Sequence, residues 1–224
     1  MRVPGEAPAS PGTSGPRVTF GPGRMNPERL HGFSDGVFAV AITLLVLQFQ
    51  VPHVPAVQLA GALLRLWPAY ASYLLSFAVV GVYWVAHWNI VHELHSGDRN
   101  LAWLNIGFLA CVAFIPFPAS LVGAYGAERP AVMLYGGTLV VTGLMLRAVW
   151  VYALRKNLID APPGLERYAM IRQLVPPAIY LAGLIIALGA PAAALAIYVC
   201  VPLLYIIPSR YINGRPVAPR EARR

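Results

Sequence analysis

Polar side chains run directly into an apolar helix near the start of this chain. The first seven residues of the segment 29–47 include Arg29, Ser34 and Asp35, and the rest of the segment is almost wholly apolar. Ionisable and polar groups at membrane depth are costly unless they are paired, and they commonly mark ion pathways, proton relays or buried structural networks. This segment is therefore the first candidate functional site.

Asp35 needs hydrogen-bond donors from other helices. It lies too far inside the predicted helix to cap the N-terminus, where a carboxylate would be stabilised. Candidate partners are Trp84 and His87 on the second apolar segment and Asn105 on the third. His87 alone could instead act as a proton relay or a metal ligand, but a metal site needs three or four converging ligands.

A second polar group follows the second apolar segment and consists of His92, Glu93, His95 and Asp98. Its residue types suit a metal ion, but polar residues are also expected where a membrane helix ends. We favour the second interpretation, so no metal site and no other cofactor is predicted.

The apolar part of residues 29–47 presents a regular face. On a helix, Val40, Leu44 and Leu47 share one side, with Thr43 beside them. If several copies met at an axis, these residues would form stacked apolar rings, and narrow apolar rings can gate ions by dewetting. Such a stripe more often faces lipid or packs in a core, so periodicity alone leaves these interpretations open.

The composition indicates an all-α integral membrane protein. Hydrophobic residues make up 58% of the 224 residues, charged residues only 12%, and the mean hydropathy is +0.60. Soluble domains are about 25% charged. The net charge of +8 does not indicate a nucleic-acid partner, because most of the basic residues flank apolar segments. The apolar segments contain no paired carboxylates and no HExxH or GxSxG motif, so no enzyme is predicted.

Six apolar segments predict six transmembrane helices. The first should begin at Asn26, a good N-cap followed by Pro27 and Glu28. We expect one transmembrane domain, 26–208, between a disordered Pro/Gly/Ser-rich arm, 1–25, and a basic tail, 209–224. The six expected helices cover 26–51, 63–94, 100–121, 131–154, 170–188 and 191–207.

The basic residues predict the orientation. With six spans, most of them fall on one side of the membrane: in the N-terminal arm, in the loops after the second and fourth helices, and in the C-terminal tail. The positive-inside rule then places both termini in the cytoplasm.

Several motifs resemble one family. Arg29, Phe33, Ser34 and Asp35 form an RxxxFSD motif followed by GVFAVAITLLVL, which resembles bacterial relatives of transmembrane protein 175, the lysosomal potassium channel. The segments YWVAH at 83–87, WLN at 103–105 and FIPFP at 114–118 resemble the second and third helices of that family.

The resemblance implies a potassium-preferring cation channel, a homotetramer in the bacterial plasma membrane with potassium ions and the lipid bilayer as partners. It implies that the first helices line the pore, with apolar rings at Val40, Leu44 and Leu47 and a hydroxyl ring at Thr43. It also implies a polar network that supports the pore helix, made by Arg29, Phe33, Ser34, Asp35, Trp84, His87 and Asn105.

Two other functions stay open. A secondary, proton-coupled transporter usually shows inverted repeats and charges near the membrane midplane, whereas this chain has no internal repeat and little midplane charge besides Asp35. A membrane protein with a purely structural role is the other alternative. The Thr-Val-Gly-Tyr-Gly filter of common potassium channels is absent from the sequence, so a channel would need another source of selectivity.

Overall fold

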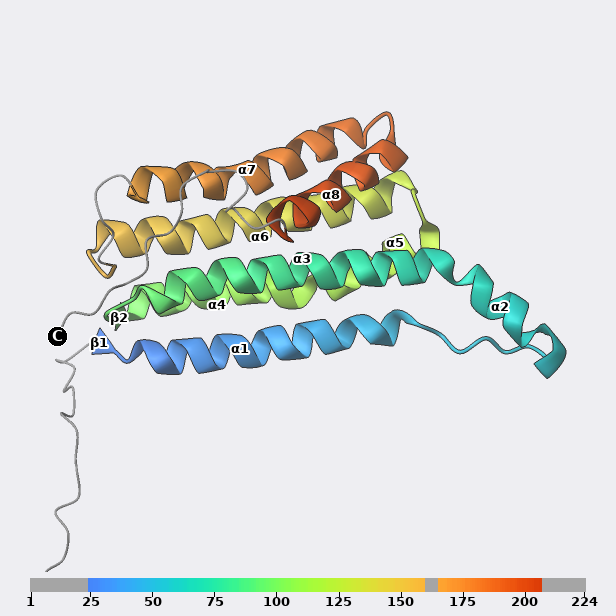
Figure 1. The fold of residues 1–224 in the computed structure, drawn as a ribbon, viewed down its shortest axis with the longest axis horizontal. Helices are drawn as coiled ribbons and strands as arrows, with labels where there is room; N and C mark the ends of the chain where they lie inside the picture. Colours follow the sequence, from blue (N-terminus) through green and yellow to red (C-terminus); the bar gives the residue numbers. More distant parts are fainter. Residues whose placement is uncertain (1–23, 160–164, 207–224) are drawn as a thin grey trace, which may run out of the picture.

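The computed structural model describes residues 24–159 and 165–206, which form a bundle of long helices running side by side (Figure 1). The helices are α1 (Pro27–Leu44), α2 (Leu59–Arg65), α3 (Trp67–His92), α4 (Arg99–Phe114), α5 (Pro116–Tyr125), α6 (Arg129–Arg155), α7 (Leu165–Ile186) and α8 (Pro191–Ile206). Two 3₁₀ turns, η1 (Leu45–Gln48) and η2 (Ala56–Gln58), and two short strands, β1 (Arg24–Met25) and β2 (Gly97–Asp98), complete the fold.

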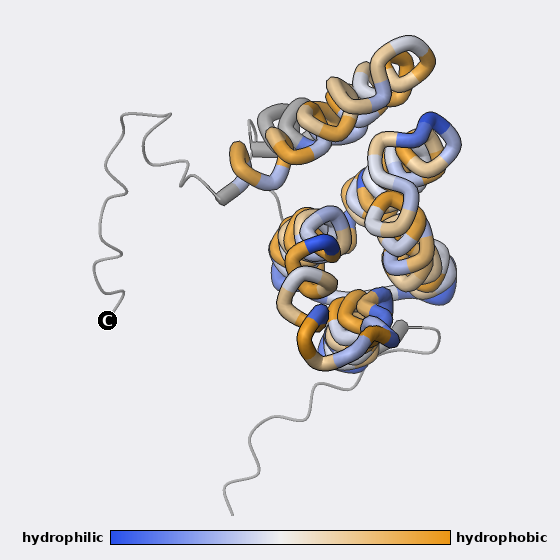
Figure 2. Tube along the Cα trace, turned by 90° about the vertical axis from the view of Figure 1, so that its right-hand side faces the viewer, coloured by the Kyte–Doolittle hydropathy of each residue, from blue (hydrophilic) through white to orange (hydrophobic). Residues whose placement is uncertain are grey.

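Four helical segments are long and apolar enough to cross a membrane, as far as the described residues show: Pro27–Gln48, Trp67–His92, Arg99–Tyr125 and Arg129–Arg155. Two shorter apolar helices, Gln173–Ile186 and Pro191–Tyr205, lie in the C-terminal part. Figure 2 shows hydrophobic residues along these helices. The chain is therefore an all-helical, multi-pass membrane protein.

The start of α1 confirms the predicted cap. The side chain of Asn26 accepts a hydrogen bond from the backbone N–H of Glu28 at 2.9 Å, and Pro27 takes the first helical position, where its missing N–H costs nothing. The predicted disordered arm, 1–25, is wrong at its last two residues, because Arg24 and Met25 pair antiparallel with Asp98 and Gly97. Residues 1–23 and the predicted tail, 209–224, lie outside the described residues.

The second and third predicted helices are each divided in two. The second is interrupted at Leu66, between α2 and α3, and the third at Ile115, between α4 and α5. Pro68 lies in the first turn of α3 and Pro116 begins α5. Proline cannot donate a backbone hydrogen bond and clashes with the preceding turn, so a new helix begins at Pro116 and one residue before Pro68.

One apolar core joins the two sides of the bundle. Helix α1 packs against α3 and α4, while α6 packs against α4, α5 and α7. The largest fully buried side chains include Phe38, Phe108, Leu101, Ile115 and Leu139. Helix α4 therefore connects α1 to the C-terminal helices.

Buried hydroxyl groups link α3 to its neighbours. Tyr83 donates to the carbonyl oxygen of Leu139 on α6 at 2.6 Å, and Ser72 donates to that of Ala119 on α5 at 2.6 Å. Interhelical hydrogen bonds of this kind contribute to helix association in membranes, where the apolar side chains gain little from leaving lipid.

Tyr198 fixes the position of α8 through close packing against two glycines. Its ring lies against Gly136 of α6 and Gly183 of α7, and a Cβ atom at either glycine would overlap the ring. Tyr135 and Tyr180 lie nearby, the first tilted and the second edge-on to Tyr198, with ring centroids 6.1 and 5.9 Å from that of Tyr198. Because glycine has no side chain, Gly136 and Gly183 allow α6, α7 and α8 to approach each other at this point.

Gly136→Ala should lower the thermal stability of the purified protein, because the new methyl group must displace the Tyr198 ring, and overpacking of this kind typically costs about 1–3 kcal/mol. Gly137→Ala is the matched control, since a Cβ there would meet nothing within 4 Å. Melting curves in detergent check this, and equal effects of the two changes would contradict the packing argument.

Candidate functional site

Helix α1 has one buried face and one face without cover. Leu30, Ser34, Phe38, Ala41 and Leu45 are buried against the bundle. On the other side Val40 is 57% exposed, Leu44 41% and Leu47 71%, and Thr43 is exposed beside them. The residues predicted for one face therefore do lie together on the outside of the bundle.

A buried hydrogen-bonded chain holds the inner face of α1. Asn105 of α4 donates from Nδ2 to the hydroxyl of Ser34 at 2.9 Å, and Ser34 donates to the carbonyl oxygen of Leu30 at 2.8 Å. The Nε2 atom of His87 lies 2.7 Å from Oδ1 of Asn105. Since an amide oxygen only accepts, His87 donates here and carries its proton on Nε2.

Aromatic rings seal this chain from the membrane. The His87 ring stacks on Phe108 of α4, with centroids 5.3 Å apart and planes 13° apart, and Phe38 of α1 lies 5.7 Å from it. Ser34, His87 and Asn105 are all at most 1% exposed. Because unpaired polar groups in such surroundings are strongly unfavourable, the chain stabilises one rotation of α1 against α3 and α4.

Asp35 takes no part in the hydrogen-bonded chain of Ser34, Asn105 and His87. The prediction that His87 and Asn105 are partners of Asp35 is therefore wrong. Its carboxylate accepts from Trp84 Nε1 at 2.9 Å and lies 3.1 Å from Nδ1 of His31. Neighbouring helical residues point about 100° apart, so Ser34 faces the core while Asp35, with a side chain 42% exposed, lies at its edge.

His31 is a site residue that sequence reasoning missed. The sequence feature that could have identified His31 is its position four residues before Asp35, because this spacing places both side chains on one side of a helix. Arg29 and Phe33, the other motif residues, are exposed on α1 and take no part in the buried chain.

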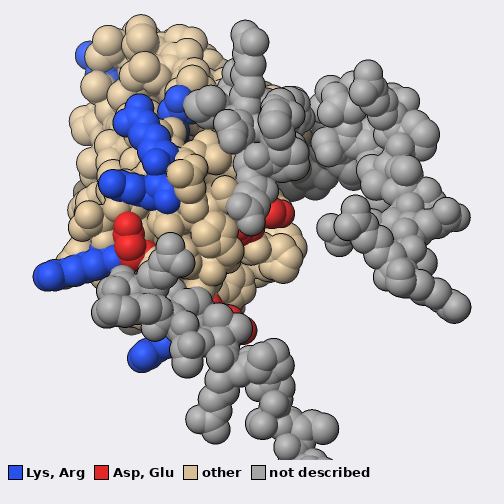
Figure 3. Space-filling view, turned by 90° about the vertical axis from the view of Figure 1, so that its left-hand side faces the viewer, with Lys and Arg blue, Asp and Glu red and all other residues tan. Residues whose placement is uncertain are grey.

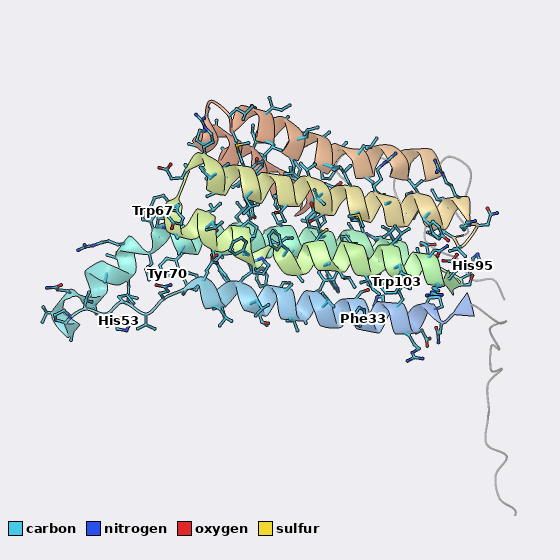
Figure 4. All side chains as sticks on the ribbon, turned by 180° about the vertical axis from the view of Figure 1, so that it is seen from behind. Phe33, His53, Trp67, Tyr70, His95 and Trp103 are labelled. Atoms are coloured by element: carbon cyan, nitrogen blue, oxygen red, sulfur yellow. The ribbon has the colours of Figure 1, made fainter. Side chains whose placement is uncertain are left out.

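The polar group after α3 has structural partners. Asp98 caps α4 by accepting from the backbone N–H of Leu101 at 2.7 Å, and it also accepts from the Tyr152 hydroxyl at 2.8 Å. His95, labelled in Figure 4, lies with Nε2 2.9 Å from the carbonyl oxygen of Asn157. Among the described residues, no group of three or more His, Cys, Asp or Glu side chains could hold a metal ion.

The first comparison with known proteins covers α1 to α4. The family model for the endosomal/lysosomal potassium channel TMEM175 matches residues 29–116. A Streptomyces collinus protein named as a potassium channel is 37% identical over 144 residues, which cover 60% of this chain and 70% of that protein. The chain belongs to the TMEM175 family. The segment matched to the family model contains the whole Ser34–Asn105–His87 chain.

Two further matches involve Chamaesiphon minutus. A protein of this organism named as a potassium channel is 39% identical over 131 residues, which span 56% of this chain and 64% of that protein. The crystal structure of a TMEM175 homologue from the same organism, described as a lysosomal potassium-selective channel homologue, superposes with a TM-score of 0.73 at 29% identity. It covers 80% of this chain and 96% of that one, so the TMEM175 fold extends beyond α1, α3 and α4.

Asn105→Leu should destabilise the protein more than Asp35→Asn. The first change leaves Ser34 and His87 without their buried partner, and each orphaned buried group costs about 1–3 kcal/mol. The second removes charge at a half-exposed edge, where an ion pair contributes at most about 1 kcal/mol. Thermal unfolding of both variants in one detergent checks the order, and the reverse order would mean that Asp35 is the main support of α1.

Proposed function

We propose that this TMEM175-family chain is a potassium-preferring cation channel, with a pore lined by α1 from four copies. The observation that supports this most is the arrangement of α1: its inner face is fixed by a buried hydrogen-bonded chain, while Val40, Leu44 and Leu47 project outward without cover. The names of the two bacterial relatives and of the solved homologue support potassium as the permeant ion.

This pore requires several copies of the chain. Helix α1 lies along one edge of the bundle, with α3, α4, α6, α7 and α8 on one side of it (Figure 1), and it packs against α3 and α4. A pathway along Val40, Leu44 and Leu47 can therefore close only when α1 helices of other copies surround the same axis. Fourfold assembly follows from the family resemblance.

The proposed topology has six spans and cytoplasmic termini. Figure 3 shows basic side chains gathered on the end of the bundle that carries β1, and the described exposed ones near that end are Arg29, Arg99, Arg155 and Lys156. Trp67 and Tyr70 lie at the opposite end (Figure 4), as expected at a membrane interface. Helices α7 and α8 supply the fifth and sixth spans, in the plasma membrane of a bacterium.

Thr43 gives the proposed pore an oxygen ring. Its hydroxyl donates to the carbonyl oxygen of Val40 at 2.8 Å, so the hydroxyl hydrogen is occupied and the oxygen lone pairs stay available for a cation. Apolar rings at Val40, Leu44 and Leu47 would narrow and dewet the path. Selectivity then comes from a narrow helix-lined pore, and we expect it to be modest.

The direct test is ion flux into liposomes that contain the purified protein, with potassium and sodium compared in parallel and empty liposomes as the control. We expect potassium flux above sodium flux. If neither potassium nor sodium enters faster than into empty liposomes, the purified protein does not conduct these ions, and the proposal is wrong.

A cysteine at position 44 should form cross-links between copies, because four Leu44 side chains would face one axis. The new cysteine is introduced into a variant in which the two native cysteines, Cys111 and Cys200, are replaced by alanine. Val141→Cys on α6, 51% exposed, is the control. Oxidation in membranes followed by non-reducing gels should give dimers at position 44 only, and dimers at position 141 alone would exclude α1 from the axis.

Leu44→Asn should raise cation flux and weaken potassium preference, because four amides would wet an apolar ring. Val46→Asn is the control: Val46 is 49% exposed, and it lies two residues further along in η1, about 120° from Leu44 by the shorter way around the helix. Flux of both ions in liposomes measures the effect. Equal changes in both variants would show that the assigned face does not line the path.

A further inference from the structure

The last turn of α1 has a different geometry from the rest of the helix. Leu45–Gln48 form the 3₁₀ turn η1, and the backbone N–H of Phe49 donates to the carbonyl oxygen of Val46, three residues back, at 3.2 Å. A 3₁₀ helix turns about 120° per residue and an α-helix about 100°. The hydroxyl of Thr43, bonded back to Val40, is the kind of contact that perturbs a helix just before such a change.

This geometry decides which way Gln48 points. Four residues after Leu44, a 3₁₀ turn places Gln48 about 120° around the helix, whereas an α-helix would place it about 40° away. In the structure its side chain lies at a junction of η1, α3 and α5, where a Cβ atom on Gly123 would be 3.2 Å from Gln48 Oε1 and 3.3 Å from Ala69 Cα. The 3₁₀ turn therefore directs Gln48 into the bundle.

The amide of Gln48 is poorly satisfied in this junction. Both Nε2 and Oε1 are buried, and neither has a hydrogen-bond partner among the residues that the structure describes. Burying an amide without partners is unfavourable, since water would satisfy both atoms. The observed conformation thus holds a polar side chain in a dry place, directly beside the proposed path.

We propose that Gln48 is a residue of the conduction pathway, which η1 withdraws in this conformation and which an α-helical last turn would return to the pore-facing edge of α1. This inference rests on the proposed function. Conversion to α-helix rotates Gln48 by about 80° toward Leu44 and Leu47 by about 60° away from it. Four amides would then hydrate the outer mouth, where the ring of Leu47 lies in the 3₁₀ form.

The chain beyond η1 can absorb this rotation. Conversion shortens four residues by about 2 Å, because the rise per residue falls from about 2.0 to about 1.5 Å. Residues 49–55 contain no helix or strand, and Gln50 and Val51 are exposed. The change therefore moves a connecting segment and breaks no helix. The packing that it must shift is that of Phe49, whose ring centroid lies 5.2 Å from that of Tyr70 and 5.4 Å from that of Tyr73 on α3.

Gln48→Met tests the energetics with a side chain of similar shape. We expect potassium flux to fall about tenfold, because the hydrated state loses its amides, while thermal stability rises because the buried amide is gone. Gln58→Met is the control, as Gln58 is exposed at the start of α2. Higher stability with unchanged flux would mean that Gln48 has only a structural role, and the proposal would be wrong.

Cysteine labelling separates this inference from the proposed function. Leu44→Cys, Gln48→Cys and Gln58→Cys are made with Cys111 and Cys200 replaced by alanine, and potassium flux is measured before and after a positively charged methanethiosulfonate reagent. Inhibition at positions 44 and 48 but not 58 supports both proposals. Inhibition at 44 without 48 overturns the role of Gln48 alone, and no inhibition at 44 overturns the pore face itself. These measurements decide the question even if Gln48→Met does not fold.

Discussion

The buried chain from Ser34 through Asn105 to His87 is the contact on which the rest of this structure depends. In a bilayer, apolar side chains gain little by leaving lipid, so they do not by themselves fix how a helix is rotated. A polar chain inside the bundle does, because each misplaced partner leaves an unsatisfied group in apolar surroundings. With Ser34 held inward, Val40 lies about 120° around the helix from it and must face outward.

The C-terminal helices support that contact from behind. Asn105 belongs to α4, and α4 packs against α6 as well as α1. The hydroxyl of Tyr83, one turn of α3 before His87, bonds to Leu139 of α6 and so fixes the other helix of the network. Close packing of Tyr198 against Gly136 then attaches α8 to α6. The path from α8 to α1 therefore runs through short, specific contacts rather than through apolar area alone.

Residue type and periodicity predicted much of this. Asn26 and Pro27 mark the start of α1 because capping chemistry is local. An all-helical membrane fold follows from the apolar segments of the sequence, and four of the described helices are long and apolar enough to cross a membrane. Trp84, His87 and Asn105 were predicted as network residues because polar groups in apolar segments need partners. Which partner each one takes was not predictable: Ser34 and Asp35 are neighbours in sequence, and only the packing of α1 on α3 and α4 decides which points inward.

The two ends of α1 differ in how firmly they are held, and this limits where the helix can change shape. At the Ser34 level three residues from three helices satisfy one another, so rotation there would break several bonds at once. At the η1 level the polar group that faces the bundle, Gln48, has no bond of this kind within the described residues. Ala41 packs between the two levels and Leu45 is the first residue of η1, and each is 1% exposed. The conformational change that we propose for α1 is therefore placed in its last turn, beyond the residues that the network holds in place.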